Sequence, residues 1–215
     1  MPHLHNNVVP TGRIRLLGSA DKHLFRSHLL RLDPETKRSR FAMLVSDSFL
    51  EAYVETSFSL DTVIYGYFED DVLRATAELR RVADDVSAEA AFCVEVDWRG
   101  QGLGSALMEL VLIAARAQGY RHIYMNCLAT NRSMQALARK FSADLSFEHG
   151  DVVAHLAPAP VAAADVAHAP GIAASGGSSG GLIGRLRELL ARTGLPGTAR
   201  PAGAAEHPGQ AAANR

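Results

Sequence analysis

Cysteine is scarce in this chain. Only Cys93 and Cys127 occur in 215 residues, which argues against a disulfide framework, because such frameworks need several cysteines in a much shorter chain. Both cysteines lie in strand-like apolar runs, so we expect buried thiols in a reducing compartment.

Long apolar runs and targeting signals are also missing. No stretch approaches the roughly 18 apolar residues that a membrane-spanning helix needs. The N-terminal residues Met1 to Asn7 lack the basic segment and following apolar run of a secretory signal. We therefore expect a cytoplasmic protein with no membrane partner.

Charge of one sign does not dominate. The 22 Lys and Arg residues are balanced by 23 Asp and Glu residues, for a net charge of -1. Without a basic stripe, nucleic acid is not an expected partner. His3 and His5 have no third ligand near them in the sequence, so we expect no metal site there.

Composition changes sharply at Pro158. Residues 1–157 mix periodic apolar positions with charges, which predicts a folded domain. Residues 158–215 are rich in Ala, Gly and Pro, so they cannot bury enough side chain to offset the entropy of ordering, and we expect a flexible tail. Within the tail, residues 182–193 have leucines at helical spacing, which predicts a short helix, either unpartnered or docking on another surface.

Apolar periodicity within residues 1–157 predicts one α/β layered domain with about four helices. Helices are expected at 20–32, 46–58, 103–118 and 131–141, the first closed by Asp33-Pro34 because the residue before proline disfavours helix. Strands are expected at 13–17, 62–68, 72–82, 88–96, 122–128, 144–147 and 152–156.

A glycine-rich turn lies between the strand at 88–96 and the helix that begins at Leu103. Glycines at positions 100, 102 and 104 let the backbone approach an anion without a Cβ in the way. The first N–H groups of a helix carry partial positive charge. Arg99 adds a cation and Ser105 a hydroxyl, so the segment can cradle a phosphate or pyrophosphate. Tight packing of strand against helix is the other explanation for these glycines.

Two other phosphate motifs fit less well. A P-loop needs Lys-Ser or Lys-Thr after its last glycine, whereas Ser105-Ala106 follows here. A dinucleotide fingerprint needs an acidic residue at the end of the next strand, where Asn126 and Cys127 stand.

Arg99-x-x-Gly102-x-Gly104 resembles the acetyl-CoA pyrophosphate motif of the GNAT superfamily. The segment from Asn131 to Phe141 resembles the next helix of that superfamily, whose first Asn lies beside the pantetheine and the adenosine phosphate. The run Asn-Arg-x-Met-x-Ala-Leu-Ala-Arg-Lys looks most like the acetyltransferase domain of Pat-type protein lysine acetyltransferases. The resemblance covers about residues 12–157.

The resemblance implies a mixed central β-sheet and a binding site for acetyl-CoA as co-substrate. The strands at 88–96 and 122–128 should splay, with pantetheine pairing along the first strand and the pyrophosphate above 101–105. An N–H near Val94 is the expected oxyanion donor. The implied cofactor-binding residues are Val94, Val96, Arg99, Gly100, Gln101, Gly102, Leu103, Gly104, Ser105, Asn131 and Met134.

Transfer to an amine needs a general base, because a protonated alkylammonium is not nucleophilic. Glu89 is the candidate, since Ala88-Glu89-Ala90-Ala91 matches the Ala-Glu-x-Ala run of Pat-type enzymes. Glu95 is the competitor, with the same strand parity. Ala138 stands where many GNAT enzymes have a tyrosine that protonates the leaving thiolate. Pat-type domains also tend to lack that tyrosine.

Two functions follow from these residues. The first is an N-acyltransferase that moves an acetyl group from acetyl-CoA to a protein lysine or a small amine. The second is an acyl-CoA-binding sensor or interaction module without turnover. The sequence leaves the acceptor, the length of the acyl group and the choice between monomer and homodimer open.

Overall fold

A seven-stranded mixed sheet forms the centre of the computed structural model, which describes residues 11–82, 85–148 and 150–158. Its strand order is β1-β2-β3-β4-β5-β7-β6, and every neighbouring pair is antiparallel except β4 and β5. The strands are β1 (Arg13–Leu16), β2 (Thr62–Glu69), β3 (Val72–Arg81), β4 (Ser87–Val94), β5 (His122–Leu128), β6 (Asp144–Glu148) and β7 (Asp151–Leu156).

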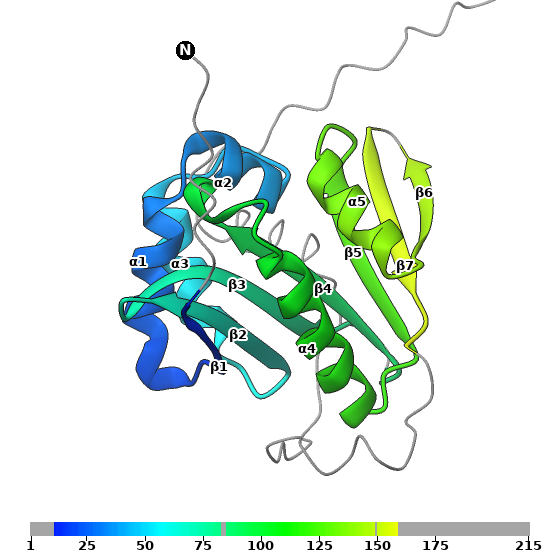
Figure 1. The fold of residues 1–215 in the computed structure, drawn as a ribbon, viewed down its shortest axis with the longest axis horizontal. Coiled ribbons are helices and arrows are strands. Elements are labelled where there is room, and N and C mark those ends of the chain that lie inside the picture. Colours follow the sequence, from blue (N-terminus) through cyan, green and yellow to red (C-terminus); the bar gives the residue numbers. More distant parts are fainter. Residues whose placement is uncertain (1–10, 83–84, 149, 159–215) are drawn as a thin grey trace, which may run out of the picture.

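Helices cover both faces of the sheet (Figure 1). One face carries α1 (Lys22–Arg31), α2 (Pro34–Phe41) and α3 (Asp47–Ser57). The hydrophobic core on this face includes Phe25 and Phe49 from the helices and Leu73 from β3. The other face carries α4 (Leu103–Ala117) and α5 (Arg132–Lys140), and its core includes Leu107 and Met125. The α/β layered domain expected from periodicity is thereby confirmed. Within the described ranges, no helix has the length and apolar content that a membrane crossing requires.

Helix α2 was not expected from the sequence, because Asp33-Pro34 was interpreted only as a stop. The same dipeptide also starts a helix: the Asp33 side chain accepts a hydrogen bond from the backbone N–H of Thr36 at 2.9 Å, and Pro34 occupies the first turn. Proline is favoured at this position because its missing N–H would have no helical partner. The domain therefore has five α-helices in its described part.

The central strands β4 and β5 separate soon after they meet. They pair in parallel at only three positions, Ser87 to Glu89 against His122 to Tyr124, whereas β5 pairs with β7 along its other edge from Ile123 to Leu128. Strand β4 ends at Val94, two residues earlier than expected, and a 3-10 turn over Val96–Trp98 follows. The expected splay of these strands is thus present, and α4 begins beside it (Figure 1).

Both cysteines are buried and unpaired, as the apolar runs around them predicted. The histidines at positions 3 and 5 and the expected tail with its helix at 182–193 lie outside the described residues.

Candidate active site

The glycine turn has the backbone that its sequence suggests. Gly100 and Gly102 have φ values of 74° and 83°, a region that side chains with a Cβ rarely adopt. Gly102 is the N-cap of α4 and accepts from Ser105 N at 2.9 Å and Ala106 N at 3.1 Å. Gly104 faces α5, where an added Cβ would lie 3.6 Å from Leu137. The turn therefore presents a helix N-terminus with little side-chain cover, which suits an anion.

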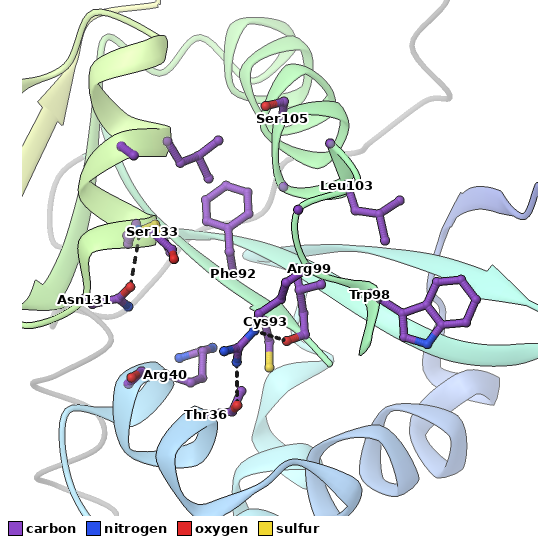
Figure 2. A pocket seen from close by; sticks show the side chains of 18 of the residues that line it. Thr36, Arg40, Phe92, Cys93, Trp98, Arg99, Leu103, Ser105, Asn131 and Ser133 are labelled. Atoms are coloured by element: carbon purple, nitrogen blue, oxygen red, sulfur yellow. Dashed lines mark hydrogen bonds between the residues drawn. The ribbon is translucent and has the colours of Figure 1, made fainter. Parts of the chain in front are cut away.

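A pocket of about 390 Å³ lies beside this turn (Figure 2). It runs between the N-terminal ends of α4 and α5, the end of β4, and α2. Nine of the eleven expected cofactor residues line it: Val94, Arg99, Gly100, Gly102, Leu103, Gly104, Ser105, Asn131 and Met134.

The other two expected residues lie apart from the lining. Val96 stands in the 3-10 turn after β4 and is 53% exposed, because the strand ends too early to include it. Gln101 is not a lining residue either, and its side chain donates to the Asp97 carbonyl oxygen at 3.0 Å.

Several lining residues were not found from the sequence. Thr36, Ser39 and Arg40 come from α2. The signal that could have found their helix is Asp33-Pro34-Glu35, an N-cap followed by proline and an acidic first-turn residue. The remaining unexpected lining residues are Phe92, Cys93, Trp98, Ser133, Ala136, Leu137 and Lys140.

Arg99 links the glycine turn to α2. Its Nε donates to the Val94 carbonyl oxygen at 3.1 Å, and its Nη2 donates to Thr36 Oγ1 at 2.5 Å. Figure 2 shows the guanidinium reaching from the turn to α2. Arg99 therefore fixes α2 over the end of β4, in addition to placing a cation at the pocket.

The start of α5 and the end of that helix both contact the pocket. Asn131 Oδ1 accepts from the Met134 backbone N–H at 3.1 Å and caps the helix. At the other end, Lys140 Nζ donates to Ser105 Oγ at 2.8 Å and so brings a second cation to the first turn of α4.

Glu89 lies on β4 where the two central strands part. It pairs in register with Tyr124 of β5, the last paired position before the splay. The side chain is 3% exposed, and Asn126 Nδ2 donates to its Oε1 at 2.7 Å. Glu89 does not line the pocket directly. It stands four residues before Cys93 on the same strand, a separation of about 13 Å for extended chain.

Glu95 has a different environment. His28 Nδ1 lies 3.1 Å from its carboxylate, Arg31 Nη2 2.8 Å and Arg74 Nη1 3.0 Å. Burial acts to raise the pKa of Glu95, but the hydrogen bonds from His28, Arg31 and Arg74 outweigh it and lower the pKa to about 2. A carboxylate this weakly basic is a poor general base near neutral pH.

Cys93 is the one thiol that lines the pocket in the described part of the chain. Burial raises its pKa to about 12, although both Arg40 and Arg99 act to lower it. With this pKa, the Cys93 thiol stays protonated at neutral pH. Since the thiolate is the nucleophilic form, Cys93 is unreactive there. The raised pKa argues against Cys93 as a nucleophile that forms a thioester.

Residues 28–142 match the sequence model of the acetyltransferase (GNAT) family. The chain belongs to this family. An acetyltransferase of Pseudomonas aeruginosa is 28% identical over 133 residues, covering 58% of this chain and 70% of the relative.

Solved structures of this family have the same fold. The GNAT domain of S. lividans PAT superposes with a TM-score of 0.61 at 24% identity, covering 68% of this chain and 90% of that domain. The PaiA N-acetyltransferase from Thermoplasma acidophilum, solved in complex with coenzyme A, gives a TM-score of 0.53 at 16% identity over 68% of this chain and 99% of that one. The family and its fold make this GNAT protein an N-acetyltransferase that uses acetyl-CoA.

Proposed function

We propose that this N-acetyltransferase acetylates a primary amine, either a protein lysine or a small amine, and is of the Pat type. The observation that carries the proposal is a pocket that joins the glycine turn of α4 to the end of β4, to α5 and to α2. The similarity to the GNAT domain of S. lividans PAT supports the Pat type, as does the Asn131 to Lys140 segment.

In the proposed complex, the glycine turn from Gly100 to Ser105 holds the pyrophosphate. Lys140, which already contacts Ser105, neutralises part of its charge. Asn131 and Met134 flank the pantetheine from α5, and the edge of β4 near Val94 pairs with its amides. Val96 lies beyond the end of this strand and has no role in the proposed site.

The chemistry proposed for the pocket is direct transfer. The neutral amine attacks the thioester carbonyl carbon, and an N–H near Val94 stabilises the oxyanion. A new C–N bond forms, the C–S bond breaks, and the electron pair leaves with the CoA thiolate. The nitrogen loses its proton to Glu89 through water, because the carboxylate lies too deep along β4 for direct contact with the pocket.

Ala138 is buried within the core on α5 and has no group that could protonate the thiolate. A thiolate is a tolerable leaving group near neutral pH. Departure of CoA thus needs only water as the proton source.

The test of this function combines amine-dependent CoA release with acetyl-CoA binding. We expect release with at least one member of a panel of amines and lysine peptides, and a loss of about a hundredfold or more in kcat for Glu89→Gln with the acetyl-CoA Kd unchanged. Glu109→Gln, which removes an exposed carboxylate on α4, is the matched control and should act as wild type. Tight binding without release for any amine would instead identify a sensor, and full activity in Glu89→Gln would refute the assignment of the base.

A further inference from the structure

The α2 end of the pocket is cationic. Arg40 and Arg99 both lie there, beside Ser39 and Thr36 (Figure 2). Among the described residues that line the pocket, none is an Asp or a Glu. Arg99 directly precedes the glycine turn, so the proposed pyrophosphate can account for its charge, whereas Arg40 comes from α2 and has no part in that motif.

Arg40 is buried and only partly hydrogen-bonded. Its side chain is 2% exposed, and its Nη2 donates to Tyr53 Oη at 2.8 Å and to Glu78 Oε1 at 2.5 Å. Its Nε and Nη1 have no hydrogen-bond partner within the described part of the chain. Buried charged donors without partners are costly and uncommon, so a further acceptor is needed beside Arg40.

Glu78 does not supply that acceptor. Its Oε2 accepts from Tyr53 Oη at 2.6 Å and also lies 4.0 Å from Arg80 Nη2. One carboxylate is therefore shared between two buried guanidiniums. An anchoring role for Arg40, which ties α2 to β3 through Glu78, explains the contacts of Nη2 and leaves Nε and Nη1 unexplained.

Arg99 adds a second positive charge beside Arg40. Its hydrogen-bond acceptors are a carbonyl and a hydroxyl. Burial acts to raise the pKa of Asp33, and the charge of Arg99 helps to lower it. The Arg40 fork that contains Nη2 is occupied by Tyr53 and Glu78, so a ligand can accept from Nη1 or from Nε only. Because hydrogen bonds between ionised groups are the stronger ones, and Glu78 is already shared with Arg80, an anionic group suits the remaining donors of Arg40.

We propose that the α2 end of the pocket binds a carboxylate, with Arg40 as its specificity-determining residue. The inference rests on the proposed function, because the carboxylate belongs to one of the two reacting molecules. It is either the distal carboxylate of a dicarboxylic acyl group on CoA or a carboxylate carried by the amine acceptor. Both sources present the same chemistry to Arg40.

The donor arm of the test compares succinyl-CoA with butyryl-CoA, whose acyl chains have the same number of carbons. Equilibrium dissociation constants are measured by calorimetry, which needs no acceptor. A carboxylate from the acyl group predicts binding of succinyl-CoA about tenfold tighter or more.

The acceptor arm uses the protein saturated with acetyl-CoA. CoA release is measured with L-amino acids and with the matching amino-acid amides, which keep the amine and lose the carboxylate. A carboxylate from the acceptor predicts kcat/KM about tenfold higher or more for the acids.

Ser39 provides a matched pair of variants that leaves Arg40 and its bonds to Glu78 and Tyr53 in place. Ser39→Asp adds a negative charge at the α2 end, whereas Ser39→Asn adds similar volume without charge. The preference for the carboxylate ligand should fall about tenfold in Ser39→Asp and persist in Ser39→Asn.

The outcomes separate the two proposals. A preference in either arm that Ser39→Asp abolishes supports the carboxylate site and identifies its source. If succinyl-CoA and butyryl-CoA bind equally well, and the amino acids and their amides react with equal kcat/KM, while acetyl-CoA binds and amines are acetylated, the carboxylate site alone is overturned. Absence of acetyl-CoA binding and of any CoA release would overturn the proposed function itself.

Discussion

Replacement of Glu95 by Gln should destabilise the fold in a pH-dependent way. Gln keeps the size of the side chain and removes the charge that His28, Arg31 and Arg74 surround. The pKa of Glu95 in the folded protein is about 2, against 4.5 for an unperturbed glutamate. A carboxyl group whose pKa is lowered by folding stabilises the folded state wherever it is ionised.

The magnitude follows from that difference in pKa. About 2.5 pKa units correspond to about 3.4 kcal/mol. The Glu95 side chain is 13% exposed and Arg31 is 38% exposed, so solvent screening reduces the contribution to about 2 kcal/mol. This stabilisation is fully present above pH about 4.5, and it is lost as the pH falls from there toward 2.

The assay is urea denaturation of wild type and Glu95→Gln at pH 7, followed by a series down to pH 3. At pH 7 the variant should unfold with a free energy about 2 kcal/mol lower, and the gap should narrow below pH about 4.5. Titrating groups that do not contact Glu95 cancel in the difference between the two proteins, whereas His28, whose pKa burial lowers and Glu95 acts to raise, does not cancel. A gap below about 0.5 kcal/mol at pH 7, or one that does not change with pH, would refute the ion-pair account.

The remaining predictions concern the strand gap, the turn and the tail. Asn126→Ala removes one donor to the Glu89 carboxylate. If Glu89 acts as the proposed base, kcat for amine-dependent CoA release should fall about tenfold while the KM for acetyl-CoA is unchanged. An equal rise in KM would argue against a positioning role. Gly102→Ala forces a φ of 83° on a residue with a Cβ, so it should lower stability by about 1 kcal/mol in urea denaturation and weaken acetyl-CoA binding in calorimetry. Truncation after Ala157 should leave both the melting temperature and the acetyl-CoA Kd unchanged, and a large drop in either would place the tail within the domain.

Local features of the sequence were enough to predict the glycine turn and the helix starts that line the pocket. The turn at Gly100 and Gly102 requires backbone conformations that glycine favours, and this requirement is visible in the residue types themselves. The apolar stripe of α4 and the N-cap of α5 at Asn131 are equally local. The mixed sheet and the splay of β4 and β5 then followed from the family resemblance.

The α2 side depends on contacts that the sequence does not display. The polar sequence of Pro34–Phe41 has no apolar stripe, because Arg40 and Thr36 are buried through hydrogen bonds to Glu78, Tyr53 and Asp33 instead of through apolar packing. Hydrophobic periodicity cannot reveal burial of that kind.

The same reasoning explains why the two glutamates could not be separated in advance. Glu89 and Glu95 have the same strand parity, yet Glu95 lies one residue past the end of β4, where a histidine and two arginines from α1 and β3 converge on it. Glu89 remains within the strand, where Asn126 donates to it. The low pKa of Glu95 arises from the elements packed around its carboxylate beyond the end of β4, and strand parity carries no information on those elements.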